Sequence, residues 1–183
     1  MRTRRPKRLR GVSYVGFQRY FLTICTAFRA RSFEDEGVVG DVHRQLLQSA
    51  LQFDVQITAY CYMPDHLHVL LTATSERSDF CESVRRFKQM SAFSYKKSTG
   101  RALWQPGYHQ RILRDDEVTE AVVRYILENP IRAGLTKNLG EYRFAGSGVY
   151  DLASLITAWE NMECGRKREG DQGGPKGPHY NQV

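Results

Sequence analysis

Residues 54–73, with the sequence DVQITAYCYMPDHLHVLLTA, decide the fold. Side chains alternate with a period of two on both sides of Pro64-Asp65, which predicts two β-strands, residues 54–63 and 66–73, joined by a tight turn. Because the turn is short, the two strands should pair antiparallel. The second strand carries His66 and His68, and strand alternation places both imidazoles on the same face.

Two registers are open for this hairpin, and they differ in what shares the histidine face. If Pro64-Asp65 alone forms the turn, Met63 pairs with His66 and the apolar Cys61 lies on the histidine side. If Met63 also belongs to the turn, Tyr62 pairs with His66, because a slip of one residue exchanges the two faces. We prefer the second register, since it separates an apolar face from a polar histidine face. That apolar face would consist of Val55, Ile57, Ala59, Cys61, Leu67, Val69 and Leu71.

Strands and helices alternate outward from the hairpin. Runs rich in β-branched and aromatic residues predict strands, and apolar residues spaced three and four apart predict helices. The helix that starts at Asp115 or Asp116 must end at Pro130, which cannot continue it. The other expected elements are strands over 20–28 and 108–113 and helices over 37–53, 79–97 and 151–162.

This order of elements, β-α-β-β-α-β-α, predicts an α+β fold. The first six elements match the ferredoxin-like βαββαβ unit, an antiparallel sheet with helices on one side. The other face of the sheet is then left for a ligand, another chain or the last helix.

Composition and charge indicate one domain with two tails. The chain has 183 residues, of which 41% are hydrophobic, enough for a core of its own. Six basic residues and no acid stand in residues 1–10, so the rest of the chain carries only +1 of the net charge of +7. We expect a basic flexible arm over 1–13, a folded domain over 14–163 and a disordered tail over 164–183.

The four cysteines, Cys25, Cys61, Cys81 and Cys164, form no CxxC pair. This spacing excludes zinc-ribbon and thioredoxin motifs and argues against a disulfide framework, so a reducing cytoplasm is expected. No apolar run reaches the ~18–20 residues that a membrane span needs, so no membrane partner is expected.

His66 and His68 are the first candidates for chemistry. Two imidazoles side by side on a polar strand face suit a divalent metal ion. The alternative is a pair of half-buried histidines with satisfied hydrogen bonds. Zinc is disfavoured, because a zinc site would require further His or Cys ligands and Cys61 points to the other face in the preferred register.

Tyr125 is the second candidate, on the helix that runs into Asn129 and Pro130. Residues four apart share a helix face, so the Asn129 amide lies beside Tyr125 and could bind a metal or a phosphate. The alternative for Tyr125 is amphipathic packing against the core.

Basic residues form two candidate surfaces for nucleic acid. Only Glu82 opposes the cations of residues 82–101, which could follow a phosphate backbone, although a merely solvated face is the alternative. The N-terminal arm is the second surface, with an organellar transit peptide as its alternative. The residues concerned are Arg85, Arg86, Lys88, Lys96, Lys97 and Arg101 on the expected helix, and Arg4, Arg5 and Arg8 in the arm.

Three segments in fixed order give a resemblance to a known family. YCYMPDHLHVLL (60–71), LWQPGYHQRILRDDE (103–117) and VVRYILENPIRAGL (122–135) together resemble the single-tyrosine HUH transposases, particularly the REP-associated tyrosine transposases of bacteria. The resemblance covers residues 14–150 and implies a ferredoxin-like topology. It also implies that His66 and His68 bind Mg²⁺ or Mn²⁺ and that Tyr125 is the nucleophile. Asn129 would be the third metal ligand, with Glu128 or Asp65 as competitors.

The resemblance further implies a metal-dependent transposase or endonuclease of single-stranded DNA, acting near hairpin sequences as a monomer or a homodimer associated with the nucleoid. Cleavage and rejoining would pass through a 5′-phosphotyrosine. The Gly-Arg-Glu-x-Tyr signature of many REP-associated members is replaced by Gly11-Val12-Ser13-Tyr14. Two alternatives remain: a domesticated HUH nicking protein, and a non-catalytic nucleic-acid-binding domain of the same fold.

Overall fold

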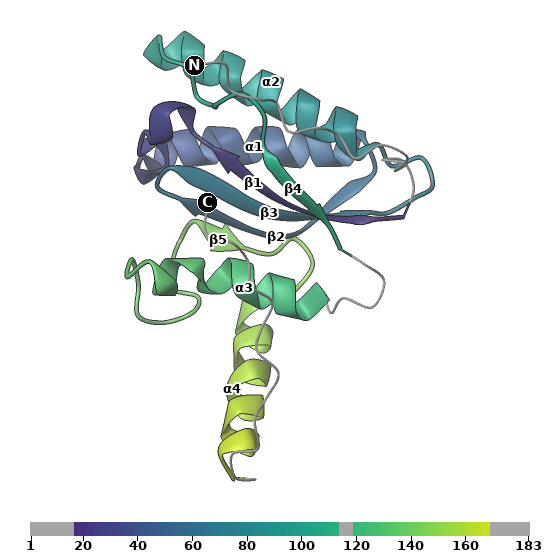
Figure 1. Ribbon diagram of the computed structural model, residues 1–183, viewed down its shortest axis with the longest axis vertical. Coiled ribbons are helices and arrows are strands. Elements are labelled where there is room, and N and C mark those ends of the chain that lie inside the picture. Colours follow the sequence, from purple (N-terminus) through teal and green to yellow (C-terminus); the bar gives the residue numbers. More distant parts are fainter. Residues whose placement is uncertain (1–16, 114–118, 169–183) are drawn as a thin grey trace.

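A five-stranded antiparallel sheet lies between two layers of helices in the described part of the chain (Figure 1). The computed structural model describes residues 17–113 and 119–168. The strand order is β4-β1-β3-β2-β5, so the first four strands have the order of the expected ferredoxin-like unit. The strands are β1 (Arg19–Cys25), β2 (Val55–Met63), β3 (His66–Ala73), β4 (His109–Ile112) and β5 (Ala145–Gly146).

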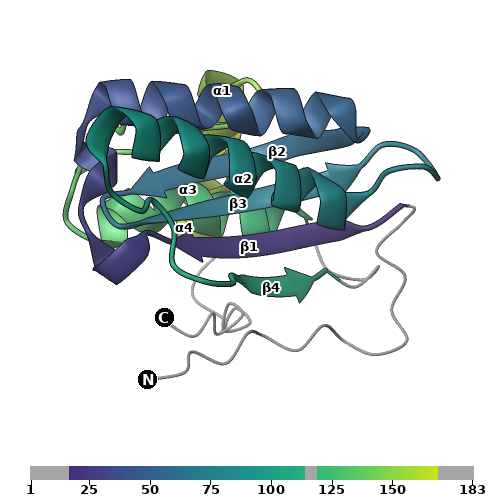
Figure 2. The same cartoon turned by 90° about the horizontal axis from the view of Figure 1, so that it is seen from above.

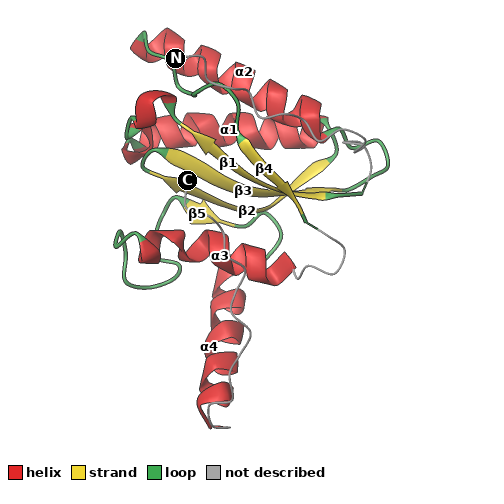
Figure 3. Ribbon diagram, in the orientation of Figure 1, coloured by secondary structure: helices red, strands yellow, loops and turns green. Residues whose placement is uncertain are grey.

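Helices cover both faces of the sheet. The helices α1 and α2 lie side by side on one face, α3 lies across the other, and α4 projects from α3 away from the sheet (Figures 1, 2 and 3). Of the three possibilities left open for the second face, a helix, α3, therefore packs on it. None of the helices in the described ranges is both long and apolar enough to cross a membrane. The helices are α1 (Glu36–Gln52), α2 (Phe80–Thr99), α3 (Thr119–Arg132) and α4 (Leu152–Arg168).

Side-chain caps define the two helices of the first layer. The Val38 N–H donates to the Asp35 carboxylate at the start of α1, and the Glu82 N–H donates to Asp79 at the start of α2. Gly100, with φ +71°, ends α2 in the left-handed conformation that glycine adopts without strain. The core beneath these helices contains Phe33, Val42, Leu46, Phe80, Val84, Phe87, Leu67, Val69 and Leu71.

The hairpin register differs from the preferred one. Met63 pairs with His66 and Cys61 pairs with His68, so only Pro64-Asp65 forms the turn. A β-bulge explains the error: Ile57 pairs with Leu71 and Ala59 with Leu70, so Thr58 is one extra residue on β2. Uninterrupted alternation across Thr58 therefore assigned Ala59 and Cys61 to the wrong face.

The histidine face is apolar around the two imidazoles, because α3 packs on it. Val122 and Ile126 of α3 and Trp159 of α4 are buried there together with Cys61 and Met63. The Trp159 indole donates to Glu120 at 2.6 Å, which ties α4 to α3. The histidine face, which the sequence predicted to be polar, is therefore part of a second hydrophobic core.

Three expected boundaries differ from the structure. β1 ends at Cys25, and the 3₁₀ turns Ala27–Arg29 and Ser32–Glu34 follow it, so Phe28 is not in a strand. α4 continues to Arg168, which makes residues 164–168 helical rather than part of a disordered tail. The remaining tail, the arm of residues 1–13 with Arg4, Arg5 and Arg8, and the cap at Asp115 or Asp116 lie outside the described residues.

α3 also continues past Pro130 to Arg132, against expectation. Pro130 has no N–H to donate to the Ile126 carbonyl, and the Asn129 side-chain amide lies 3.4 Å from that oxygen. Beyond Arg132 the helix is closed by a turn, in which the N–H of Leu135 donates to the Pro130 carbonyl and the N–H of Gly134 donates to the Ile131 carbonyl. Local hydrogen bonds therefore replace the one that proline removes.

Candidate active site

The two histidines converge on each other at the end of the hairpin. His66 Nε2 and His68 Nε2 are 3.1 Å apart, and the ring planes are nearly perpendicular at 85°. His66 follows the turn directly and is half-buried, whereas His68 is 7% exposed. The strand therefore presents two ring nitrogens to one point.

The other nitrogen of each ring has a fixed partner. His66 Nδ1 donates to the Asp65 carboxylate at 2.6 Å, and His68 Nδ1 lies 2.9 Å from the Thr23 hydroxyl. Asp65 in turn pairs with Arg29 Nε at 3.0 Å. These contacts orient both rings so that the Nε2 atoms point inward, as outer-shell partners do in metal sites.

Burial keeps both imidazoles neutral. It lowers the pKa of His66, although the neighbouring Asp65 opposes this effect. It lowers the pKa of His68 to about 3, with smaller contributions from His66, Arg132 and Arg29. Neutral imidazole is the form that binds a metal ion.

The spacing of the two Nε2 atoms fits a chelated divalent ion. Adjacent ligands of an octahedral ion with bonds of about 2.1 Å stand about 3.0 Å apart, which the 3.1 Å separation matches. No cluster of three or more His, Cys, Asp or Glu side chains suited to a metal occurs among the described residues. The side-chain amide of Asn129 is a candidate for a further protein ligand.

Tyr125 lies on the histidine face. Its ring centroid is 6.1 Å from that of His68, and Phe21 of β1 contacts both rings, at 5.6 Å from His68 and 5.8 Å from Tyr125. The side chain is half-buried rather than enclosed in the core. Sequence spacing alone could not show this proximity, because Tyr125 follows His68 by 57 positions in the chain.

Arg132 adds a positive charge beside Tyr125. Its guanidinium lies 4.4 Å from the centre of the Tyr125 ring and donates to the Tyr125 carbonyl at 3.0 Å. Glu128 pairs with both Arg132 and Arg124, at 3.1 and 2.6 Å. These ion pairs occupy the Glu128 carboxylate, which makes it a weak competitor for a metal.

Asn129 is half-buried one turn after Tyr125. Its amide nitrogen donates to the Tyr125 carbonyl at 2.8 Å, so the amide oxygen is the atom that could bind a metal ion. Asp65, the other competitor, contacts the Nδ1 side of His66, away from the converging Nε2 atoms. Asn129 therefore remains the best candidate for the third ligand.

The cations of α2 lie on the opposite side of the sheet from this site, because α2 packs on the face that Leu67 and Val69 occupy. DNA bound at both Tyr125 and α2 would have to pass around a sheet edge. DNA binding stays a prediction for Arg86, Lys96 and Lys97 of α2 and for Arg101, which follows the helix, while Arg85 pairs with Glu82 at 2.7 Å.

Lys88 does not belong to an open phosphate-binding surface. Its ammonium donates to the carbonyl oxygens of Gln105 and Gly107 and lies 5.7 Å from the centre of the Tyr108 ring. Burial lowers the pKa of Lys88 to about 8. The side chain thus fastens the segment before β4 to α2.

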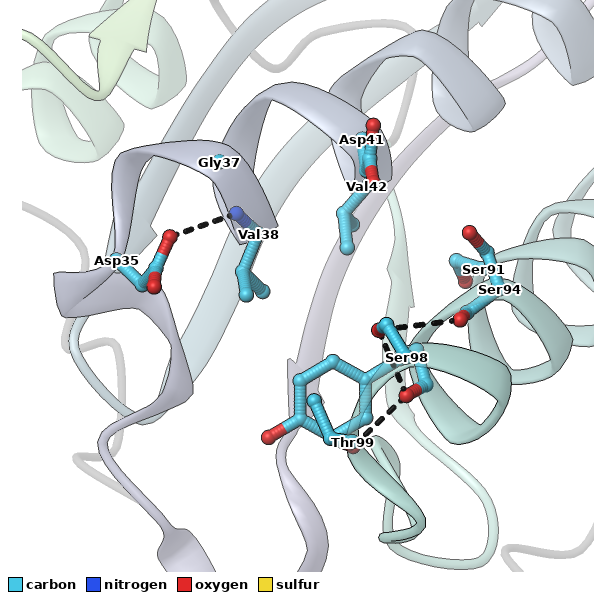
Figure 4. A pocket seen from close by; sticks show the side chains of 10 residues that line it. Asp35, Gly37, Val38, Asp41, Val42, Ser91, Ser94, Ser98 and Thr99 are labelled. Carbon is cyan, nitrogen blue, oxygen red and sulfur yellow. Dashed lines mark hydrogen bonds between the residues drawn. The ribbon is translucent and has the colours of Figure 1, made fainter.

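A separate hollow of about 290 Å³ lies between α1 and α2 (Figure 4). Its hydroxyl groups are used locally: Ser98 donates to the Tyr95 carbonyl at 3.1 Å, and Thr99 donates to the same carbonyl at 2.7 Å. Asp35 accepts from the backbone of α1. The hollow has no histidine or cysteine in its lining.

Thr23, Arg29 and Arg132 are site residues that the sequence did not reveal. Thr23 reaches His68 because β1 pairs with β3 in a register that sets these two residues opposite each other. The spacing of Arg132, seven residues after Tyr125, could have indicated a shared helix face. Arg29 stands in a loop without periodicity, so no sequence signal marked it.

Fold and site together define a class of domain in which a histidine pair on a strand faces a tyrosine on a helix. Comparisons with known proteins identify the family. Residues 16–129 match the family described as "Transposase IS200 like". The chain belongs to this family of IS200-like transposases and is related to the REP-associated tyrosine transposases.

Individual relatives are distant in sequence. The REP-associated tyrosine transposase of Escherichia coli is 25% identical over 91 residues, 49% of this chain and 53% of that protein. The ISDra2 transposase TnpA of Deinococcus radiodurans is 30% identical over 128 residues, 66% of this chain and 89% of that protein. A solved structure of a REP-associated tyrosine transposase bound to a REP hairpin superposes with a TM-score of 0.63 at 19% identity, over 76% of this chain and 82% of the other. That likeness confirms the α+β fold.

Proposed function

We propose that this protein is a metal-dependent transposase of single-stranded DNA that cleaves and rejoins strands through a phosphotyrosine on Tyr125. The observation that carries the proposal is the position of the Tyr125 ring, 6.1 Å from His68, on the face where two imidazole nitrogens converge. Membership in a transposase family supports the same activity.

His66 and His68 would hold Mg²⁺ or Mn²⁺ through their Nε2 atoms, with the Asn129 amide oxygen as a third ligand. When bound, the ion supplies positive charge that neutralises and orients the scissile phosphate. Asp65 and Thr23 would keep the imidazoles aimed at the ion. With Nε2 of His68 free for the ion, Nδ1 carries the proton and donates to the Thr23 hydroxyl, which accepts it.

Tyr125 would perform the covalent step. Its hydroxyl oxygen attacks the phosphorus in line, the bond from phosphorus to the 3′ oxygen breaks, and that oxygen takes a proton to leave as a 3′-OH. The tyrosine proton passes to solvent. Arg132, whose guanidinium lies over the Tyr125 ring, would favour the phenolate and the charge on the phosphate. Because the phosphotyrosine bond retains the energy of the broken bond, a 3′-OH can reverse the step without ATP.

The substrate class follows from the chemistry and from the relatives. Pairing and stacking in a duplex hide the bases, so a site that contacts the bases beside the scissile phosphate requires unpaired nucleotides, and single-stranded DNA is the expected substrate. A relative of the same fold is bound to a REP hairpin. We therefore propose a hairpin beside the cleavage site as the recognition element.

The test is a covalent adduct that resists SDS. Wild-type protein, incubated with Mn²⁺ and a labelled single-stranded oligonucleotide that carries a hairpin, should form the adduct, and chelation should prevent it. Tyr125→Phe should form none, while its noncovalent binding and stability stay close to wild type because only one hydroxyl is lost. Tyr150→Phe is the matched control, since Tyr150 is an exposed tyrosine outside the site.

Two results would contradict this assignment. A persistent adduct in Tyr125→Phe would transfer the nucleophile to another tyrosine, with Tyr108 as the next to replace. DNA binding without an adduct under any metal condition would instead favour the non-catalytic binding domain.

A further inference from the structure

The segment after β1 exposes an aromatic ring in a strained conformation. Phe28 is 99% exposed, and its backbone has φ +57°, followed by Arg29 at φ +55°. Residues other than glycine rarely adopt this left-handed region, and a bulky side chain makes it costlier. Burial does not compensate Phe28, so folding alone does not explain its conformation.

The backbone around Phe28 is nevertheless held firmly. The Ala27 N–H donates to the Leu103 carbonyl at 2.8 Å, and the Thr26 N–H donates to the Asp65 carbonyl at 3.0 Å. After Phe28 in the chain, the Phe33 N–H donates to the Pro64 carbonyl at 3.0 Å. The exposed ring therefore projects from a fixed support rather than from a loosely tethered loop.

The same bonds place this support against the candidate active site. Two of them end on Pro64-Asp65, the turn that leads directly into His66. Arg29, the next residue after Phe28, pairs with the Asp65 carboxylate, which accepts from His66 Nδ1. The exposed ring thus adjoins the residue whose ion pair orients a metal ligand.

We infer that Phe28 is a stacking platform for a base of the single-stranded DNA substrate, at a nucleotide adjoining the scissile phosphate. This inference rests on the proposed function and names a contact that positions its substrate. An exposed aromatic ring with cations nearby matches a nucleotide, which offers a flat base and a phosphate together. Arg29 and Arg31 are the cations of this segment: Arg29 pairs with Asp65, and Arg31 forms an exposed ion pair with Glu34 at 2.8 Å that a phosphate could replace.

Other exposed apolar side chains lack this combination. Phe93 is 67% exposed on α2, in an ordinary helix and across the sheet from the histidines. Single surface hydrophobes of that kind are common and need no function. Phe28 differs because strain, fixed support and proximity to Asp65 coincide at one residue.

The test compares Phe28→Ala, Phe28→Trp and the matched control Phe93→Ala, all in the Tyr125→Phe background so that covalent capture does not distort binding. Fluorescence anisotropy with a labelled hairpin oligonucleotide gives the dissociation constant. Alanine substitution at a stacking aromatic weakens binding about 5- to 100-fold, so we expect that loss for Phe28→Ala. Phe28→Trp should retain the affinity of the parent, and Phe93→Ala should leave it unchanged.

The Phe28→Trp variant gives an independent readout. Trp104 and Trp159 are buried, so acrylamide should quench mainly the introduced indole, and saturating DNA should protect it. Three results would each overturn the inference: equal affinity of Phe28→Ala and its parent, an equal loss in Phe93→Ala, or an introduced indole that stays open to acrylamide when DNA is bound. Failure of the proposed function is seen separately, as the absence of an adduct in a chain that retains Tyr125.

Discussion

Asp65 joins two parts of the site that are distant in sequence. Its carboxylate accepts from His66 Nδ1 and pairs with Arg29, 36 residues earlier. A carboxylate in this position fixes the tautomer and orientation of a ligating histidine and raises its basicity. Metal affinity should therefore depend on a residue that is not itself a ligand.

Replacing Asp65 tests this dependence. Asp65→Ala should lower Mn²⁺ affinity about 10- to 100-fold, the usual cost of losing an outer-shell partner. Isothermal titration with Mn²⁺ measures the effect. Asp41→Ala is the control, because Asp41 forms an exposed ion pair with Arg44 on α1, away from the site. Wild-type affinity in Asp65→Ala would show that the His66 ring is held by packing alone.

The two histidines should differ in what they contribute to stability. His68 is 7% exposed, stacks on Phe21 and contacts Thr23, whereas His66 is only half-buried. His68→Ala would leave a cavity and an unsatisfied hydroxyl, at a cost of about 1–3 kcal/mol in the free energy of unfolding. His66→Ala should cost less than about 1 kcal/mol. Urea unfolding without metal distinguishes the two, and equal losses would contradict this difference.

At the scale of elements, the sequence predicted the type and order of nearly every strand and helix. Long periodic segments such as α1 and α2 carry a strong signal, and Asp79 and Gly100 mark the ends of α2 through capping chemistry. β5 has only two residues and forms by pairing with β2, so no local sequence pattern could predict it. α3 passes Pro130 because the Asn129 side chain supplies a local hydrogen bond to the Ile126 carbonyl, which the general rule that proline ends a helix does not include.

The candidate site was predictable in composition but not in arrangement. His66 and His68 share a strand face by alternation, and Tyr125 shares a helix face with Asn129 by spacing. That α3 packs on the histidine face, while α2 packs on the other, depends on the connections between elements. Arg29 reaches Asp65 through an irregular turn, where periodicity gives no information.

Lys88 connects α2 to the segment before β4, and its titration should be visible in stability. Its pKa is about 8 in the folded protein against 10.5 in the unfolded chain, because burial disfavours the charge. Between these values the unfolded state binds a proton that the folded state lacks, so the free energy of unfolding rises with pH. At pH 7 both states are protonated and this slope is absent.

Lys88→Met removes the titrating group, so comparison with wild type isolates it. The stability of wild type relative to the variant should increase by about 1–3 kcal/mol from about pH 8 to pH 10.5. Chemical denaturation at several pH values measures this difference. Parallel pH profiles would mean that the Gln105 and Gly107 carbonyls keep the ammonium charged.

At the scale of the whole molecule, one chain contains both halves of the candidate site. α3, which carries Tyr125, packs on the same sheet that carries His66 and His68. We therefore expect each chain to cleave DNA alone. A mixture of Tyr125→Phe and His66→Ala proteins should form no adduct, because every site then lacks one group.

Complementation would contradict an active site within one chain. If the helix of one subunit served the histidines of another, mixed dimers would contain one site with both groups intact, and adduct formation would return. Mixing two wild-type preparations, one carrying a purification tag, gives adducts of two sizes and serves as the positive control.

The extra residue at Thr58 has a consequence for how this sequence changes in evolution. Before the bulge, Ile57 contributes to the core under α1, and after it Ala59 and Cys61 contribute to the core under α3. Deletion of one residue at the bulge would move Ala59 and Cys61 to the face under α1 and α2. The same deletion would move the larger Tyr60 and Tyr62 to the face under α3. Compensating mutations would have to arise together. In an alignment of homologues, insertions and deletions should therefore fall outside residues 55–68, and this length should be inherited as a unit.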